Sequence, residues 1–92
     1  MKEIIENTVK ELNEVLPKEK KLTIENETPL IDEKSKLESI DLVNLFVILE
    51  RNLKNAGKLT LTFDEMMKNI DSLKTIGSLE NFLVYKEKNE KN

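Results

Sequence analysis

Residues 39–54 read Ser-Ile-Asp-Leu-Val-Asn-Leu-Phe-Val-Ile-Leu-Glu-Arg-Asn-Leu-Lys, the most apolar helical pattern of the chain. At about 100° per residue, most of its apolar side chains gather on one side and predict a wide core stripe. The members of this stripe are Leu42, Leu45, Phe46, Leu49 and Leu53, with Val43 at its margin. Ile40 and Val47 fall together on another face, where a surface helix is normally polar. They either pack under a neighbouring loop or are kept for a partner.

Further amphipathic helices are expected before and after this stretch. Apolar residues in the segment 2–16 recur close to i, i+4, i+7 and i+11, which predicts a first helix that stops near Pro17. Thr62 and Glu65 are three residues apart and form a capping box for a short helix over residues 63–69.

The last helix is predicted to begin after Thr75 as its N-cap and to fade by Tyr85, leaving residues 86–92 as a flexible polar tail. Its expected core residues are Ile76, Leu79, Phe82 and Leu83. Gly57 is the expected stop of the central helix. Residues 58–62 alternate like a strand, but a lone strand has nothing to pair with.

A long connection, residues 17–38, precedes the central helix and shows no sustained period. Such a length is unusual in a small domain, so the connection is expected either to pack through its apolar residues or to serve a function. The residues expected to tuck under the bundle are Leu22, Ile24, Leu30 and Ile31.

The composition indicates one small all-α domain. The chain has 92 residues, of which 38% are hydrophobic and 36% charged, with only 2 Gly, 2 Pro and 4% aromatic residues. A net charge of -3 argues against binding to nucleic acid. No Cys or His is present, which removes disulfides, Cys/His zinc sites and imidazole-based catalysis. No membrane span and no signal peptide are recognised, so a cytoplasmic protein is expected.

Ser39 stands out because it joins the long connection to the most apolar helix, where alone it is typical of an N-cap. Between positions 25 and 50 only Lys34 and Lys36 oppose seven acidic residues. The acidic residues are Glu25, Glu27, Asp32, Glu33, Glu38, Asp41 and Glu50. This field would repel a free phosphate and favours a basic partner protein. Acid and base catalysis by the pair Glu38 and Asp41 is the weaker interpretation, because acids in a first turn complement the helix dipole.

Residues 37–50, Leu-Glu-Ser-Ile-Asp-Leu-Val-Asn-Leu-Phe-Val-Ile-Leu-Glu, resemble the phosphopantetheine attachment region of acyl carrier proteins. An amphipathic first helix, Thr28-Pro29-Leu30 in the long loop, a short third helix and the Thr75-Ile76 start of the last helix match that family in order and spacing. The resemblance extends over residues 4–85. It implies a four-helix bundle of acyl-carrier type, three main helices plus one short helix, in a single domain over residues 1–85.

By this resemblance, Ser39 would carry a 4'-phosphopantetheine arm that a phosphopantetheinyl transferase moves from coenzyme A. The terminal thiol of the arm would hold acyl groups as thioesters for acyl-transferring or acyl-activating enzymes, so the cofactor would bring the sulfur that the chain lacks. The carrier itself would not be an enzyme and would hold no metal. Met1 at the start and a polar tail at the end indicate a free-standing carrier, expected to be a monomer.

The predicted docking surface surrounds the serine and is composed of Glu38, Ile40, Asp41, Asn44, Val47, Glu50 and Arg51. Glu38 replaces the usual Asp of the family, Lys36 stands where Gly is common, and Asn44, Arg51 and Asn52 replace acids. Because Arg51 would repel a basic partner, the resemblance implies a specialised pathway rather than the general fatty-acid pathway. Met66 and Met67 either line an adaptable groove for an acyl chain or pack in the core.

Four alternative interpretations follow from the sequence. The tripeptide Asp71-Ser72-Leu73 also matches the literal attachment motif, but no long apolar helix starts at it, so Ser72 is interpreted as part of the connection into the last helix. An unmodified helical interaction module would use Ser39 only as a cap, worth about 1 kcal/mol of stability. A helix-turn-helix DNA binder conflicts with the apolar central helix and the negative charge, and a stand-alone enzyme lacks catalytic groups.

Overall fold

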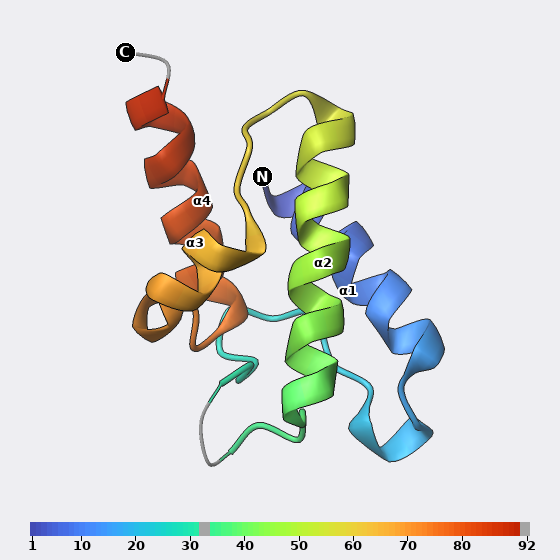
Figure 1. Cartoon of the computed structure of the whole chain (residues 1–92). Helices are drawn as coiled ribbons and strands as arrows, with labels where there is room; N and C mark the ends of the chain where they lie inside the picture. The colour runs from blue at the N-terminus through green and yellow to red at the C-terminus, as the bar shows by residue number, and fades with distance from the viewer. Residues whose placement is uncertain (32–33, 91–92) are drawn as a thin grey trace.

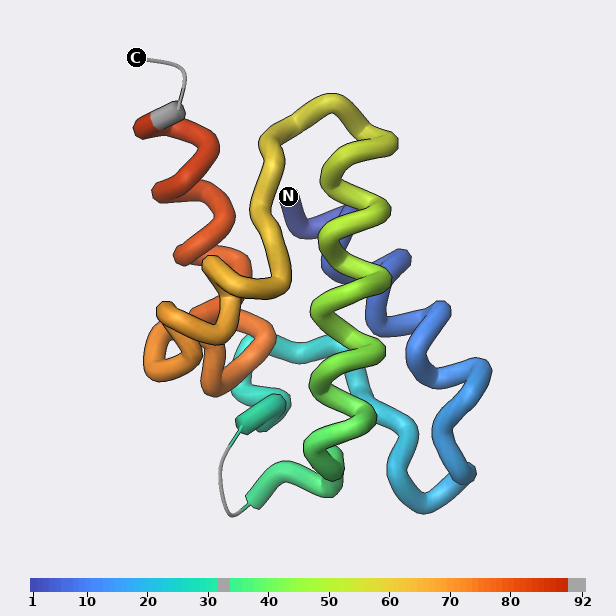
Figure 2. The backbone as a smooth tube through the Cα atoms, in the orientation of Figure 1, coloured from blue at the N-terminus to red at the C-terminus, as the bar shows by residue number. Residues whose placement is uncertain are grey.

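The computed structural model describes residues 1–31 and 34–90, and within these ranges the chain is all-α (Figure 1, Figure 2). The α-helices of the described residues are α1 (Lys2–Val15), α2 (Ser39–Ala56), α3 (Phe63–Lys68) and α4 (Ile76–Glu90). Short 3-10 turns η1 (Lys18–Lys20) and η2 (Ile70–Ser72) lie between them, and no strand occurs in the described parts of the chain. Helices α1 and α2 run in opposite directions, side by side, and α3 lies against α2.

One hydrophobic core fills the space between the helices. The spacing of Ile5, Val9, Leu12 and Leu16 places them on one side of the first helical segment, all buried. From α2 the core receives Leu45, Phe46, Leu49 and Leu53, each fully buried. The remaining buried apolar residues are Leu30, Leu59, Leu61, Met66, Leu73, Ile76, Leu79 and Leu83. The predicted stripe is therefore confirmed for these four α2 residues, while Leu42 is partly buried and Val43 is exposed.

Helix α2 begins at Ser39, but its N-cap is Glu38, whose backbone is extended. The Glu38 N–H donates to the Asp41 carboxylate at 3.0 Å. The sequence-based interpretation of Ser39 as the cap is therefore wrong by one residue, because a Glu can take the cap position when an acid follows three residues later. At the other end Gly57 adopts φ +66° and ends the helix, as predicted.

The long connection is fixed by hydrogen bonds to the start of α4. Leu30 N–H donates to the Lys74 carbonyl at 2.7 Å, and Gly77 N–H donates to the Asn26 carbonyl at 2.9 Å. A Cβ at Gly77 would lie 3.0 Å from that carbonyl oxygen, so a residue without a side chain permits the close approach. The connection thus forms part of the folded unit rather than a free loop.

The apolar residues of this connection divide into two groups. Leu30 is buried, and Leu22 and Ile31 are partly buried against the core, as expected. Ile24 is 36% exposed, so its predicted burial is wrong. It lies in the short turn between Leu22 and Thr28, and the hydroxyl of Thr28, not an apolar side chain, fills the inside of that turn by donating to the Thr23 carbonyl at 2.9 Å.

The two C-terminal helices begin as predicted. The Thr62 hydroxyl accepts the Glu65 N–H at 3.2 Å, and the Thr75 hydroxyl accepts the Ser78 N–H at 3.1 Å. The expected end of α4 at Tyr85 is wrong, since the helix continues to Glu90. This extra length is tied back to α3 by an ion pair of 3.1 Å between Lys86 and Glu65.

Three smaller predictions in this half of the chain have mixed outcomes. Residues 58–62 form no strand, as expected, and their leucines Leu59 and Leu61 both enter the core. Phe82 is only partly buried, not fully as predicted. Of the predicted tail, residues 91–92 lie outside the described residues.

None of the described helices combines the length and the apolar character needed to cross a membrane.

Candidate functional site

Ser39 is the first residue of α2 and is exposed to solvent. Within the described part of the chain, its hydroxyl has no hydrogen-bond partner. The N–H groups of the first helical turn and the positive end of the helix dipole lie beside it. The Ser39 hydroxyl is therefore accessible from solvent, and a negative group attached to its oxygen would lie beside the positive end of the α2 dipole.

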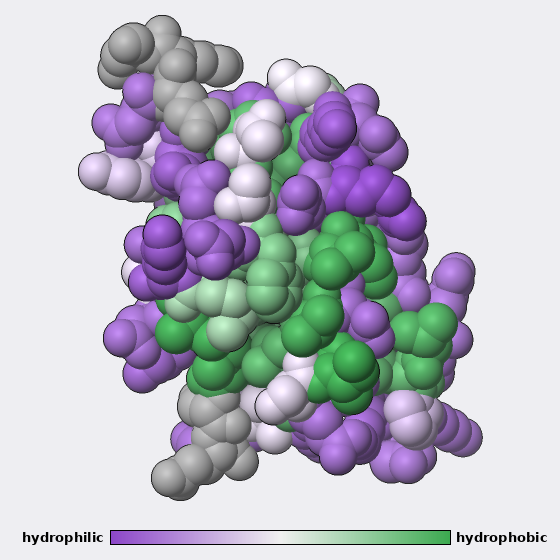
Figure 3. Space-filling view, in the orientation of Figure 1, coloured by the Kyte–Doolittle hydropathy of each residue, from purple (hydrophilic) through white to green (hydrophobic). Residues whose placement is uncertain are grey.

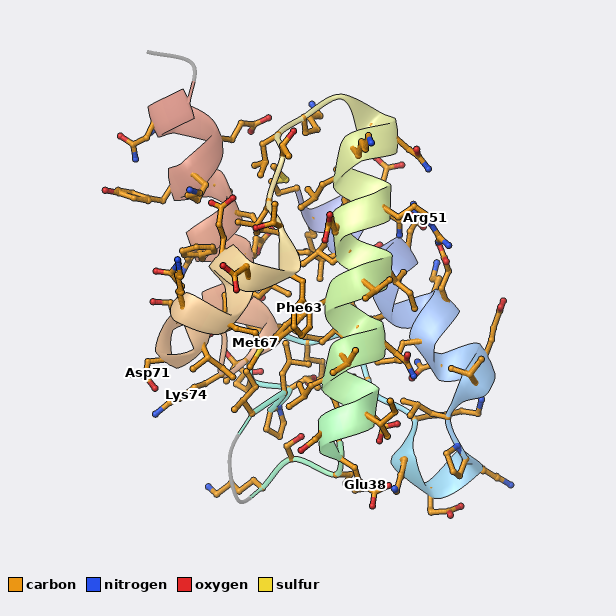
Figure 4. All side chains as sticks on the ribbon, viewed as in Figure 1. Glu38, Arg51, Phe63, Met67, Asp71 and Lys74 are labelled. Carbon is orange, nitrogen blue, oxygen red and sulfur yellow. The ribbon has the colours of Figure 1, made fainter. Side chains whose placement is uncertain are left out.

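The carboxylates that flank Ser39 are both held by specific contacts. Glu38, at the start of α2 (Figure 4), receives a hydrogen bond of 2.7 Å from the ammonium group of Lys20, which lies on η1. Asp41 is occupied as the acceptor for the Glu38 backbone N–H. Both acids thus have partners at the start of α2, a lysine for Glu38 and a backbone N–H for Asp41.

Lys20 belongs to the surroundings of Ser39, although it is 19 positions earlier in the sequence. Its pKa is raised, first by the hydrogen bond to Glu38 and further by the charges of Glu38, Asp41 and Glu19. Lys20 lies outside residues 25–50, the segment whose charges were counted around Ser39 in the sequence. Two acids of that segment, Asp32 and Glu33, lie outside the described residues. A Lys-rich turn directly after Pro17 was the only signal in the sequence, and it does not indicate which acid would be its partner.

An exposed apolar surface begins directly after Ser39. Ile40 is 62% exposed, Val47 53% and Val43 38%, and together they form the α2 stripe. Figure 3 shows apolar surface over α2 and toward α3. Met67 of α3 is also exposed. Of the two possibilities for Ile40 and Val47, burial under the long connection is therefore wrong, and both side chains face solvent.

Two residues of the predicted docking surface are engaged in internal contacts. Glu50 accepts the backbone N–H of Phe63 at 3.1 Å and so fixes the start of α3. Arg51 forms an ion pair with Glu11 of α1 and lies on the α1 side of α2 (Figure 4). The hydrogen bonds from Arg51 and Asn52 lower the pKa of Glu11. The charge that was expected to repel a basic partner is thus already paired within the molecule.

Asn44 is exposed, and with Val15 and Val47 it lines a shallow groove between α1 and α2. The other residues of the predicted docking surface lie at the protein surface, next to Ser39 or farther along α2. They are Glu38, Ile40, Asp41, Asn44 and Val47.

The two methionines of α3 have different environments. Met66 is fully buried in the core, which supports core packing for this residue. Met67 is 43% exposed, and Figure 4 shows it with Phe63 near the line where α3 meets α2. Phe63 in turn packs on Phe46 with ring centroids 6.2 Å apart. An adaptable surface at this point would therefore depend on Met67 alone.

Ser72 is the last residue of η2 and is followed by the buried Leu73. No α-helix starts at it, and its backbone N–H donates to the Asn69 carbonyl at 2.9 Å. The interpretation of Ser72 as part of the connection into α4 is confirmed. Ser39 is thus the residue of the two that combines exposure with the start of a long helix.

The chain was compared with known proteins by sequence and by structure. No family model matches it, and neither a curated protein nor a solved structure matches it.

Proposed function

We propose that this protein is an acyl carrier protein, in which Ser39 carries a 4'-phosphopantetheine arm. The proposal depends on one observation above all: Ser39 is exposed, has no hydrogen-bond partner among the described residues and begins the most apolar helix. The four helices, with a long first connection and a short α3, are compatible with the bundle implied by the sequence resemblance.

The modification requires a nucleophilic oxygen and a separate transferase. The Ser39 oxygen attacks the phosphorus of coenzyme A that bears the pantetheine, a new O–P bond forms, and the P–O bond to adenosine 3',5'-bisphosphate breaks. The serine proton passes to a base of the transferase. When bound, the arm supplies the thiol for thioester formation, which this chain cannot supply without Cys. The residues of the chain contribute an accessible hydroxyl and the positive end of α2.

The α2 stripe fits the role of a docking surface for the enzymes that load and unload the carrier. Exposed Ile40, Val43 and Val47 lie on the same helix as Ser39, so a partner that binds them has the attachment point within its footprint. Asn44, Arg51 and Asn52 stand where the sequence resemblance implies acids, so the α2 surface is less acidic than that of general fatty-acid carriers. Arg51 itself is paired with Glu11. The less acidic surface favours the specialised carrier over a general fatty-acid carrier.

Intact-mass measurement tests the proposal. The protein is incubated with coenzyme A, magnesium and a promiscuous phosphopantetheinyl transferase, in parallel with Ser39→Ala and Ser72→Ala. We expect a gain of one phosphopantetheine in the parent protein and in Ser72→Ala, and none in Ser39→Ala. If several transferases leave the parent protein unmodified, the proposal is wrong.

An unmodified helical interaction module is the second candidate function. The α2 stripe supports it, because an exposed apolar surface can bind a partner protein whether or not Ser39 is modified. The two candidates differ in one outcome. Partner binding by the module would survive Ser39→Ala, whereas all carrier activity would be lost.

A further inference from the structure

We propose that Lys20 assists the modification of Ser39: its ammonium group attracts the pyrophosphate of coenzyme A and offsets the repulsion by the flanking carboxylates. This inference rests on the proposed function and adds a residue from outside the attachment motif.

The geometry brings Lys20 to the attachment point from the first connection. Its ammonium nitrogen lies 2.7 Å from a carboxylate oxygen of Glu38, the residue immediately before Ser39. The backbone of Lys20 is fixed by a hydrogen bond of 2.9 Å from its N–H to the Pro17 carbonyl. The following residue, Lys21, donates from its ammonium group to the Asn13 carbonyl near the end of α1. The fold thus holds the cation against Glu38, the sequence neighbour of Ser39, although Lys20 itself is distant in the sequence.

The side chains of the pair differ in exposure. That of Lys20 is 28% exposed, whereas that of Glu38 is 69% exposed. The ammonium group therefore lies against the protein surface, while the carboxylate is largely open to water. The charge of Asp41 also contributes to the raised pKa of Lys20, so both acids near Ser39 act electrostatically on this ammonium group.

The charges explain why such a lysine matters. The pyrophosphate of coenzyme A must approach Ser39 past Glu38 and Asp41, and like charges at contact distance oppose that approach. The dipole of α2 supplies only about half a positive charge. A full positive charge next to Glu38 removes part of the repulsion and remains available to the incoming phosphate, since an ammonium group has three donors.

The rate of modification measures this role. Initial rates with limiting transferase are compared for the parent protein, Lys20→Met, Lys20→Arg and the matched control Lys18→Met, which lies on the same turn and is exposed. We expect Lys20→Met to be modified about tenfold more slowly, while Lys20→Arg and Lys18→Met stay within about twofold of the parent rate. The difference should shrink at 0.5 M salt because screening weakens it.

A double variant separates a direct role from a purely structural ion pair. If Lys20 acts only by holding Glu38, then Lys20→Met will cause no further loss in a Glu38→Gln background. We expect a further loss of several-fold, because the ammonium group acts on the phosphate itself. No further loss, or a rate for Lys20→Met equal to or above that of Lys18→Met, would overturn the inference. An unmodified parent protein would instead contradict the proposed function.

Discussion

The Glu50 carboxylate accepts the backbone N–H of Phe63 at 3.1 Å and thereby joins the middle of α2 to the first residue of α3. The Phe63 ring packs on Phe46, one turn before Glu50 on α2. A six-residue helix has little stability of its own, so α3 depends on such tertiary contacts. Glu50, expected from the sequence to contact a partner, is therefore first a residue that positions α3.

Replacing Glu50 should loosen α3. We expect Glu50→Ala to lower the free energy of unfolding by about 1 kcal/mol, because the Phe63 N–H loses its acceptor. Glu50→Gln keeps an acceptor oxygen and should lose less than half as much. Urea unfolding followed by circular dichroism measures both values, and equal losses in the two variants would contradict this role of the carboxylate.

Ser39→Ala should leave stability nearly unchanged, within about 0.5 kcal/mol, because Glu38 and not Ser39 occupies the N-cap. Asp41→Ala should cost about 1 kcal/mol, since it removes the acceptor of the Glu38 N–H. Thermal unfolding of the two variants checks the contrast. A larger loss in Ser39→Ala than in Asp41→Ala would return Ser39 to the role of a cap.

The same comparison shows how far the sequence predicts this structure. Helix positions and core residues such as Leu45 and Leu49 follow from periodicity, because burial selects one face of each helix. The starts of α3 and α4 follow from Thr62 and Thr75, whose hydroxyls have a local and recognisable capping role. Periodicity and capping patterns thus suffice to predict a contact when its two groups lie within a few residues of each other in the sequence.

Contacts between distant segments could not be predicted in this way. The Lys20–Glu38 and Arg51–Glu11 pairs join residues 18 and 40 positions apart, and any acid of the chain could have served as partner. The part of α4 beyond Tyr85 also makes a contact between distant segments, the ion pair of Lys86 with Glu65 of α3. These contacts change the interpretation of the site, because they determine which charges around Ser39 remain open to a partner.

Lowering the pH should reduce the free energy of unfolding, partly because Glu65 becomes protonated. Its pKa lies below the usual value near 4.5, mainly because Lys86 donates a hydrogen bond to it. The unfolded state therefore takes up a proton first as the pH falls, so the stabilisation is complete above about pH 4.5 and is lost as the pH drops through the lower folded-state pKa. We expect the free energy of unfolding to decrease in this range.

Lys86→Met tests this assignment, since it removes the main cause of the lowered pKa. The decrease in stability between pH 6 and pH 3 should become smaller in this variant. Lys68→Met is the matched control, because the contact of Lys68 with Asp64 is longer, at 3.7 Å, and largely exposed. An unchanged pH dependence in Lys86→Met would show that the ion pair with Glu65 does not contribute.

The α2 stripe should be required for partners and dispensable for folding. Val47→Asp places a charge on a side chain that is 53% exposed, so we expect the free energy of unfolding to change by less than about 0.5 kcal/mol. Transfer of acyl groups by a partner enzyme should fall at least tenfold, because a charge would have to be desolvated in an apolar contact. Asn44→Asp, one turn earlier on α2, adds the same charge at a residue that is already polar, and it should reduce transfer less. If Val47→Asp transfers acyl groups as fast as the parent protein, the α2 stripe is not the docking surface of the proposed carrier.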